Sequence, residues 1–100
     1  MERNKIVGYG ELLLRLTPSN HSQLIDQATS LNLSFGGSES NIISSLSILG
    51  HNTKMITSFP NNSLGKSANR FLRSFGVNTD DIIFRNGRIG TYFIEHEHYI

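Results

Sequence analysis

The chain has 100 residues, a formal net charge of +1, four histidines and no cysteine. Its length suits about one small domain, and its apolar and charged fractions are ordinary for a soluble globular protein. The lack of cysteine excludes disulfides and thiolate metal sites, and the near-neutral charge gives no electrostatic reason to expect nucleic acid or an anionic membrane as partner. No apolar run approaches the roughly 20 residues of a membrane span, and no signal-peptide core is present, so we expect a soluble, cytoplasmic protein.

The first elements are predicted to be strands. Residues 5–10 form a short, mostly apolar run closed by glycine, which is typical of a buried parallel strand. Residues 12–16 continue extended, residues 17–20 (TPSN) carry a loop signal, and the polar residues 21–30 are predicted to be a connection. Residues 31–35 place apolar side chains at every second position, which predicts a half-buried strand.

Two glycines, Gly36 and Gly37, interrupt this strand and lead into a predicted helix that stops at Gly50. The helix is indicated by apolar residues at helical spacing: Ile42, Ile43, Leu46 and Leu49. Glycines allow close approach of a ligand to the backbone, and unpaired N–H groups at a helix start suit hydroxyls or carboxylates. Asn41, about one turn into the helix, can both donate and accept. The alternative is a tight turn in which Ser38 is simply the N-cap.

The second half continues the alternation of strands and helices. Residues 53–59 are strand-like and give a β-α-β spacing with the preceding strand and helix. Ser63 is predicted to cap a second helix that ends at Gly76. Its apolar stripe comprises Leu64, Ala68, Phe71, Leu72 and Phe75. A short apolar run at 82–84 and a strand over 88–94 follow. Because about two helices serve about five strands and the sequence ends in an extended run, we expect the N-terminal part of a longer α/β protein with a largely parallel sheet.

Other chemical motifs are incomplete. The segment Gly65-Lys66-Ser67 invites a P-loop interpretation, but the required first glycine is Pro60, which has no N–H for a phosphate. His96 and His98 share a strand face, yet nothing nearby completes a metal site, so an exposed strand or loop is predicted. No serine nucleophile motif and no basic–aromatic stripe is present. Tyr92 is a core residue by default, although a strand tyrosine beside a ligand turn can present its hydroxyl.

Six segments, in order, resemble the ribokinase-like (PfkB) carbohydrate kinases: GE at 10–11, GGSESN at 36–41, LG at 49–50, PNNSLG at 60–65, FGV at 75–77 and GTYFIE at 90–95. The opening GELLLRLTP and the strand GRIGTYFIE most resemble the 2-keto-3-deoxygluconate kinase branch. The resemblance covers nearly all of residues 5–95. It implies the N-terminal part of a Rossmann-like α/β/α fold, without a separate second domain, and lid strands around residues 12–18, 28–35 and 88–96.

The resemblance also implies an activity: transfer of the γ-phosphoryl group of ATP, with Mg²⁺, to a sugar or sugar acid such as 2-keto-3-deoxygluconate. The full-length protein would be a homo-oligomer, dimeric through its lid. Substrate binding would fall to Gly36, Gly37, Ser38, Glu39, Ser40, Asn41, Tyr92 and Glu11. Glu11 stands near the substrate-binding aspartate of ribokinase relatives, so its role is open.

The family's catalytic aspartate belongs to a Gly-Ala-Gly-Asp motif that this sequence lacks. We therefore expect no catalytic residue, no metal ligand and no ATP site in these residues, and no activity from the 100-residue chain alone. One alternative is a non-catalytic sugar-binding or dimerisation module derived from the fold. Another is a nucleoside- or fructose-specific kinase of the same superfamily.

Overall fold

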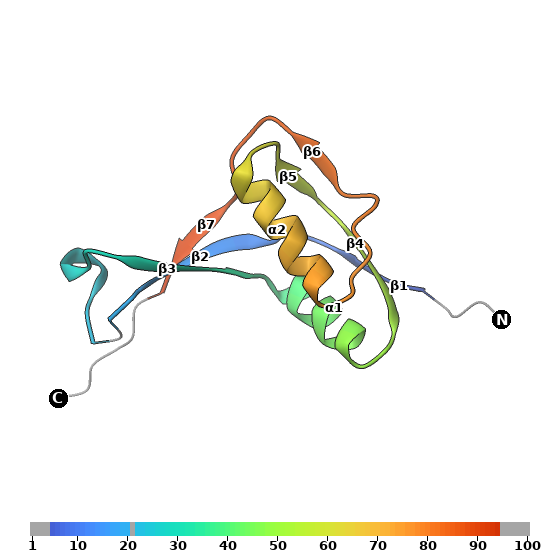
Figure 1. The fold of residues 1–100 in the computed structure, drawn as a ribbon, viewed down its shortest axis with the longest axis horizontal. Coiled ribbons are helices and arrows are strands. Elements are labelled where there is room, and N and C mark those ends of the chain that lie inside the picture. The colour runs from blue at the N-terminus through green and yellow to red at the C-terminus, as the bar shows by residue number, and fades with distance from the viewer. Residues whose placement is uncertain (1–4, 21, 95–100) are drawn as a thin grey trace.

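The computed structural model describes residues 5–20 and 22–94. It is an elongated α/β structure, 57 × 33 × 18 Å, in which a long β-sheet extends from a part that holds both α-helices (Figure 1). The elements in chain order are β1 (Lys5–Tyr9), β2 (Leu13–Pro18), the 3-10 helix η1 (Ile25–Gln27), β3 (Leu31–Gly36), α1 (Ser38–Ile48), β4 (Asn52–Ile56), β5 (Ser58–Pro60), α2 (Ser63–Ser74), β6 (Ile83–Arg85) and β7 (Thr91–Phe93). Neither described α-helix is long and apolar enough to cross a membrane.

The part that holds the helices contains two parallel strand pairs, β1 with β4 and β5 with β6. The predicted β-α-β unit was wrong in its first strand, because the parallel partner of β4 is β1, whereas β3 belongs to another sheet. The predicted strand 53–59 is divided into β4 and β5, since its two halves pair with different strands. Parallel strands share one carboxyl edge, and that edge positions the site described below.

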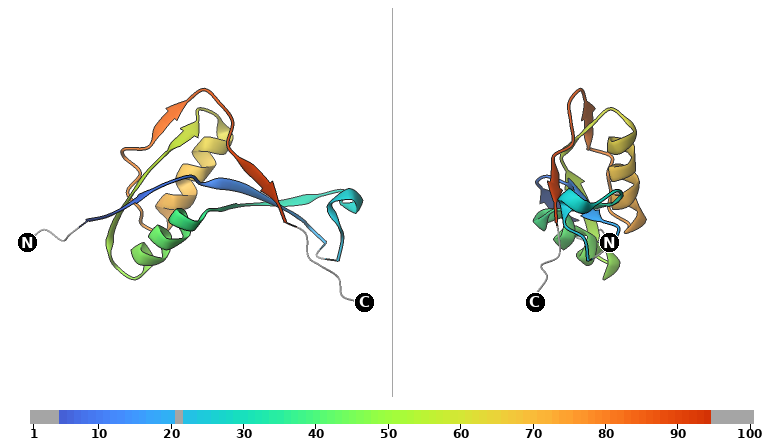
Figure 2. Two further views of the ribbon diagram at one scale, coloured as in Figure 1. Left: turned by 180° about the vertical axis from the view of Figure 1, so that it is seen from behind. Right: turned by 90° about the vertical axis from the view of Figure 1, so that its left-hand side faces the viewer.

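The extended sheet, which we call the arm sheet, has the strand order β3-β2-β7 (Figure 2). Its β2 pairs antiparallel with β3 and parallel with β7. The expected loop at 17–20 begins later than predicted, because β2 continues through Pro18, the Cα partner of Leu31. The expected strand 88–94 is shorter, because residues 88–90 form a connection whose Gly90 carbonyl accepts from the Leu14 N–H at 2.9 Å.

Successive residues of a strand point to opposite faces, so the register gives the arm sheet two different faces. Leu16 of β2 is paired with Leu33 of β3 and Phe93 of β7, which makes one face apolar. The opposite face carries Arg15 of β2, aligned with a serine of β3 and a tyrosine of β7, and is polar. Near the helices α2 covers the apolar face: the rings of Phe35 and Phe71 lie 5.4 Å apart.

A single cluster of buried apolar residues joins the helices to the strands: Leu12, Leu14, Ile43, Met55, Phe59, Ala68, Leu72, Val77, Ile82 and Ile89. The predicted stripe of α2 is confirmed, since Ala68 and Leu72 are fully buried and the other three members pack against the cluster.

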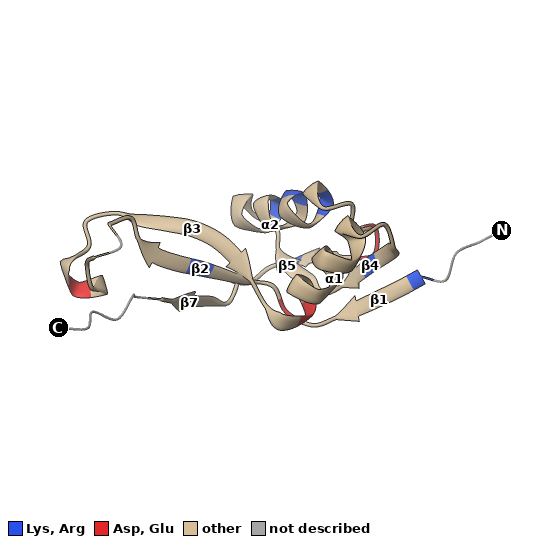
Figure 3. Ribbon diagram, turned by 90° about the horizontal axis from the view of Figure 1, so that it is seen from below, with Lys and Arg blue, Asp and Glu red and all other residues tan. Residues whose placement is uncertain are grey.

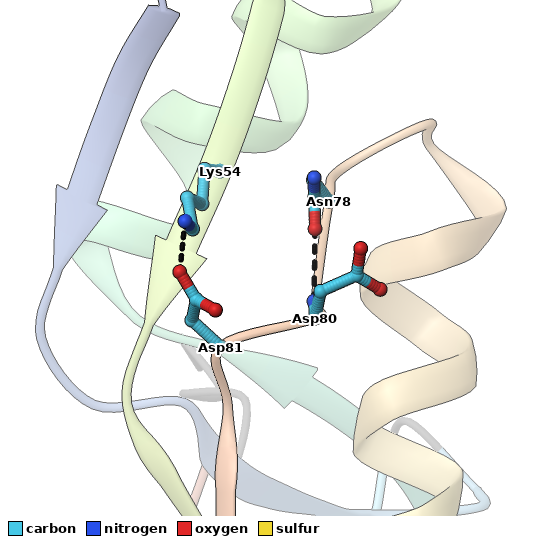
Figure 4. A network of polar contacts seen from close by, with 4 residues as sticks. All are labelled: Lys54, Asn78, Asp80 and Asp81. Carbon is cyan, nitrogen blue, oxygen red and sulfur yellow. Dashed lines mark hydrogen bonds and ion pairs between the residues drawn. The ribbon is translucent and has the colours of Figure 1, made fainter.

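Polar contacts also hold the chain that follows α2. Asp81 forms an ion pair with Lys54 of β4, beside the turn in which Asn78 Oδ1 accepts from the Asp80 N–H at 2.8 Å (Figure 4). The ion pair, together with the backbone hydrogen bonds between Asn78 and β4, attaches the chain after α2 to the β1–β4 pair.

The helix caps differ from those predicted. Gly37, not Ser38, is the N-cap of α1, and the Ser38 hydroxyl instead donates to Glu39 Oε2 at 2.9 Å. At α2 the N-cap is Asn62, not Ser63, because the amide oxygen of Asn62 accepts from the Gly65 N–H at 3.0 Å. The predicted helix ends are confirmed: Gly50 and Gly76 both have positive φ, 98° and 88°.

Candidate active site

The glycine turn, by which we mean residues 36–41, lies against the carboxyl end of β1. Gly37 has φ of 154°, and a Cβ added there would lie only 2.5 Å from the backbone oxygen of Glu11. A Cβ on Gly10 would lie 2.9 Å from the carboxylate carbon of Glu39. Figure 3 shows acidic residues where β1 ends and α1 begins. The structure therefore brings Glu11 and the glycine turn together, although β2, η1 and β3 lie between them in the sequence.

Tyr92 of β7 meets the same turn from the arm sheet. A Cβ added to Gly36 would lie 2.6 Å from the Tyr92 hydroxyl oxygen, so a side chain at position 36 would displace this ring from the turn. Tyr92 is half-buried and makes no hydrogen bond to another described side chain. Of the two expectations for Tyr92, a core ring or a hydroxyl presented at the turn, the geometry matches the second.

The first turn of α1 contains polar side chains that are hydrogen-bonded and one, Asn41, that is not. The Ser40 hydroxyl is buried and donates to the Gly37 carbonyl at 3.0 Å, and the Ser38 hydroxyl is bonded to Glu39. The Asn41 N–H donates to the same Gly37 carbonyl at 2.9 Å, as helix geometry requires. The Asn41 side chain is exposed and bonds to no described residue, so its amide can donate to and accept from a ligand.

A cleft of about 490 Å³ adjoins the turn through Glu11. Besides Glu11 and Leu12, it is lined by residues 57–60 and 85–90. A neighbouring hollow of about 390 Å³ shares Glu11 and Arg85. Both lie where β1, β4 and β6 reach their carboxyl ends, the edge at which open α/β sheets bind ligands. Sequence reasoning missed residues 57–60 and 85–90 as cleft residues; the turn at 85–87 after the apolar run 82–84 was the available signal, whereas residues 57–59 fell inside the predicted strand 53–59.

The N-terminus of α2, where the sequence GKS invites a P-loop interpretation, does not fit the phosphates of a nucleotide. At the N-terminus of α2, the Gly65 N–H is bonded to the Asn62 side chain and the Lys66 N–H to the Asn62 carbonyl. A Cβ on Gly65 would overlap the Pro60 carbonyl oxygen, so this turn is closed rather than open for an anion. Within residues 5–20 and 22–94, no three His, Asp or Glu side chains cluster as metal ligands. His96 and His98 lie outside the described residues.

The sequence matches the pfkB family carbohydrate kinases over residues 3–98. The chain belongs to this family. It is 42% identical to 2-dehydro-3-deoxygluconokinase from Thermotoga maritima, with a TM-score of 0.88 over 93% of this chain and 28% of that one. A PfkB family carbohydrate kinase from Listeria grayi is 36% identical, with a TM-score of 0.87 over 93% of this chain and 29% of that one. The 2-dehydro-3-deoxygalactonokinase of Haloferax volcanii is 32% identical over 91% of this chain and 28% of its own length.

This PfkB-family chain thus spans about 28% of the length of the relatives it matches. The predicted fold class, a ribokinase-like α/β fold, is confirmed by these structures. The same fold occurs in a sugar kinase of Pyrococcus horikoshii solved in complex with ATP, with a TM-score of 0.83 at 22% identity over 93% of this chain and 31% of that one.

Proposed function

We propose that this PfkB-family chain forms the substrate-binding and lid part of an ATP-dependent kinase for a 2-keto-3-deoxy sugar acid or a similar carbohydrate. The observation that carries the proposal is the meeting of Glu11, the glycine turn and Tyr92 at the carboxyl edge of the parallel strands. The names of the relatives from Thermotoga maritima and Haloferax volcanii support a keto-deoxy sugar acid as the substrate class.

Each group at the turn has a role suited to a polyol. Hydroxyls need both donors and acceptors, which the exposed Asn41 amide provides. The Glu11 carboxylate, exposed at the cleft, accepts hydrogen bonds from sugar hydroxyls. The glycines of the turn let the sugar approach the backbone, and the Tyr92 hydroxyl closes the turn on the side of the arm sheet. Gly36, Gly37, Ser38, Glu39 and Ser40 shape this surface.

We assign the role of lid to the arm sheet. Its strands β2, β3 and β7 fall within the segments 12–18, 28–35 and 88–96, apart from Gly36. Its polar face carries Tyr92, which lies against the glycine turn. A lid over the sugar excludes water, which protects the phosphoryl group from hydrolysis.

The phosphoryl donor in this proposal is ATP with Mg²⁺. In this proposal the ATP site and the catalytic base belong to another part of the protein, since the start of α2, which resembles a P-loop in sequence, is closed by Asn62 and Pro60. The 100-residue chain alone is then inactive, because phosphoryl transfer needs positioned charge around the phosphate and a base for the attacking hydroxyl.

Replacing Asn41 with alanine tests the sugar-binding role. We expect the KM of the complete protein for its sugar to rise about 10- to 100-fold, because the variant loses hydrogen bonds to hydroxyls in a partly desolvated site. The melting temperature should stay unchanged, since the side chain bonds to no described residue. Steady-state kinetics with Ser45→Ala, an exposed position on the same helix, is the matched control. A KM equal to that of the wild type for Asn41→Ala would count against the site.

The apolar face of the arm sheet supports a homodimer through the lid. Away from α2, three large apolar residues of this face are exposed. Their relative accessible surfaces are 38% for Leu31, 64% for Leu33 and 56% for Phe93. A contiguous exposed apolar surface on a sheet favours a protein partner, and self-association is the simplest closed arrangement.

Leu33→Glu should therefore shift the complete protein from dimer to monomer in light scattering after size exclusion, because it places a charge in the apolar interface. The matched control is Asn32→Glu, which adds the same charge to the next residue, on the other face of the strand. A monomeric wild type, or dissociation by both variants alike, would contradict dimerisation through this face.

A further inference from the structure

Arg15 is a half-buried cation in the middle of the polar face of the arm sheet. The register aligns it with Ser34 of β3 and with Tyr92 of β7. Its Nε donates to the Ser34 hydroxyl at 2.8 Å. This hydrogen bond orients the guanidinium and leaves its two terminal nitrogens available to other acceptors.

No carboxylate pairs with Arg15 among residues 5–20 and 22–94, where the ion pair found joins Lys54 to Asp81. Removing a cation partly from water without an opposite charge is unfavourable. The position therefore favours an anion that these residues do not supply. By contrast, Arg70 and Arg73 of α2 are exposed and need no partner.

Arg15 is also close to the proposed sugar site. Aligned residues on neighbouring strands lie about 5 Å apart, so Arg15 and Tyr92 stand side by side on one face. The Tyr92 hydroxyl reaches Gly36, whereas the carboxylate of Glu39 lies by Gly10, at the end of β1. A ligand with one anionic end would be repelled by this carboxylate and attracted toward Arg15.

We propose that Arg15 recognises the carboxylate of an acidic sugar and so selects sugar acids over neutral sugars. This inference rests on the proposed function, because its ligand is the sugar of the kinase. A guanidinium and a carboxylate form two parallel N–H···O bonds, a geometry that no neutral hydroxyl reproduces. Ser34 is a positioning residue, which holds the guanidinium in the orientation for that contact. A neutral sugar would leave the half-buried cation unpaired.

The test is isothermal titration calorimetry of the complete protein with 2-keto-3-deoxygluconate and with its uncharged amide. We expect Arg15→Gln to weaken binding of the acid by about 10- to 100-fold and to leave binding of the amide unchanged. Arg15→Lys, which keeps the charge but not the paired donors, should recover part of the loss. Arg73→Gln makes the same change of charge on the exposed face of α2 and should alter neither affinity.

Ser34→Ala gives a second route if Arg15→Gln does not fold. It removes only the orienting hydroxyl and should weaken binding of the acid by a few-fold without affecting the amide. Equal losses for acid and amide in either variant, or no loss in both variants, would overturn the role of Arg15 while leaving the kinase assignment intact. A wild-type protein that neither phosphorylates nor binds a sugar acid would instead overturn the proposed function, and this inference with it.

Discussion

The Gly37→Ala variant should lose at least about 100-fold in kcat/KM for the sugar, the largest functional effect that we expect from one added methyl group. The backbone at Gly37 has φ of 154°, which a residue with a Cβ adopts at a cost of about 1–3 kcal/mol. The added Cβ would also lie 2.5 Å from the Glu11 backbone oxygen, so the turn must move away from the end of β1. Steady-state kinetics on the complete protein measures the loss.

The Gly50→Ala variant separates the cost of the unusual backbone angle from the effect of the steric contact with Glu11. Gly50 also has a positive φ, 98°, but a Cβ there would meet no atom within 4 Å. We expect Gly50→Ala to lower the melting temperature while kcat/KM is maintained. If Gly37→Ala behaved like Gly50→Ala, with stability reduced and kcat/KM intact, the contact between the glycine turn and Glu11 would not matter for the sugar site.

The Gly65→Ala variant should show the largest loss of stability, about 3 kcal/mol in the free energy of unfolding. A Cβ at Gly65 would overlap the Pro60 carbonyl oxygen and lie 3.3 Å from Phe59 Cβ, so α2 could not begin beside β5 as it does. Urea denaturation of the complete protein measures the change. Lys66→Ala, at the next and exposed position of α2, should change stability by under about 0.5 kcal/mol. A loss of under about 1 kcal/mol for Gly65→Ala would show that the helix start can shift at little cost.

Local patterns in the sequence predicted local structure well. The stripe of α2 and the glycines that end both helices were correct, because each depends on residues within a few positions of one another. The strand pairing was not predictable in this way. Residues 31–35 were assigned to the β-α-β unit, yet β3 pairs with β2 in the arm sheet, and β1 supplies the parallel partner of β4. Nothing local distinguishes these two partners.

The site was predicted in its parts but not in its assembly. The glycines, Asn41 and Glu11 stood out for their chemistry or for their resemblance to the family. The contact of Tyr92 with Gly36 depends on β7 joining the arm sheet, a pairing between distant segments. Arg15 was not singled out, because its half-buried position and its hydrogen bond to Ser34 exist only in the folded sheet. The cap of α2 was misplaced for a local reason: Asn62 and Ser63 are both good cap residues, and the side-chain geometry selects Asn62.

The most direct test of the account is an ATP-coupled phosphorylation assay. It compares the protein from the gene's full reading frame with the 100-residue chain, using 2-keto-3-deoxygluconate, fructose and ribose. We predict turnover by the full protein with preference for the keto-deoxy acid, and none by the 100-residue chain. If neither protein phosphorylates any of the three sugars while sugar binding is retained, the kinase account is wrong and the chain is a sugar-binding module.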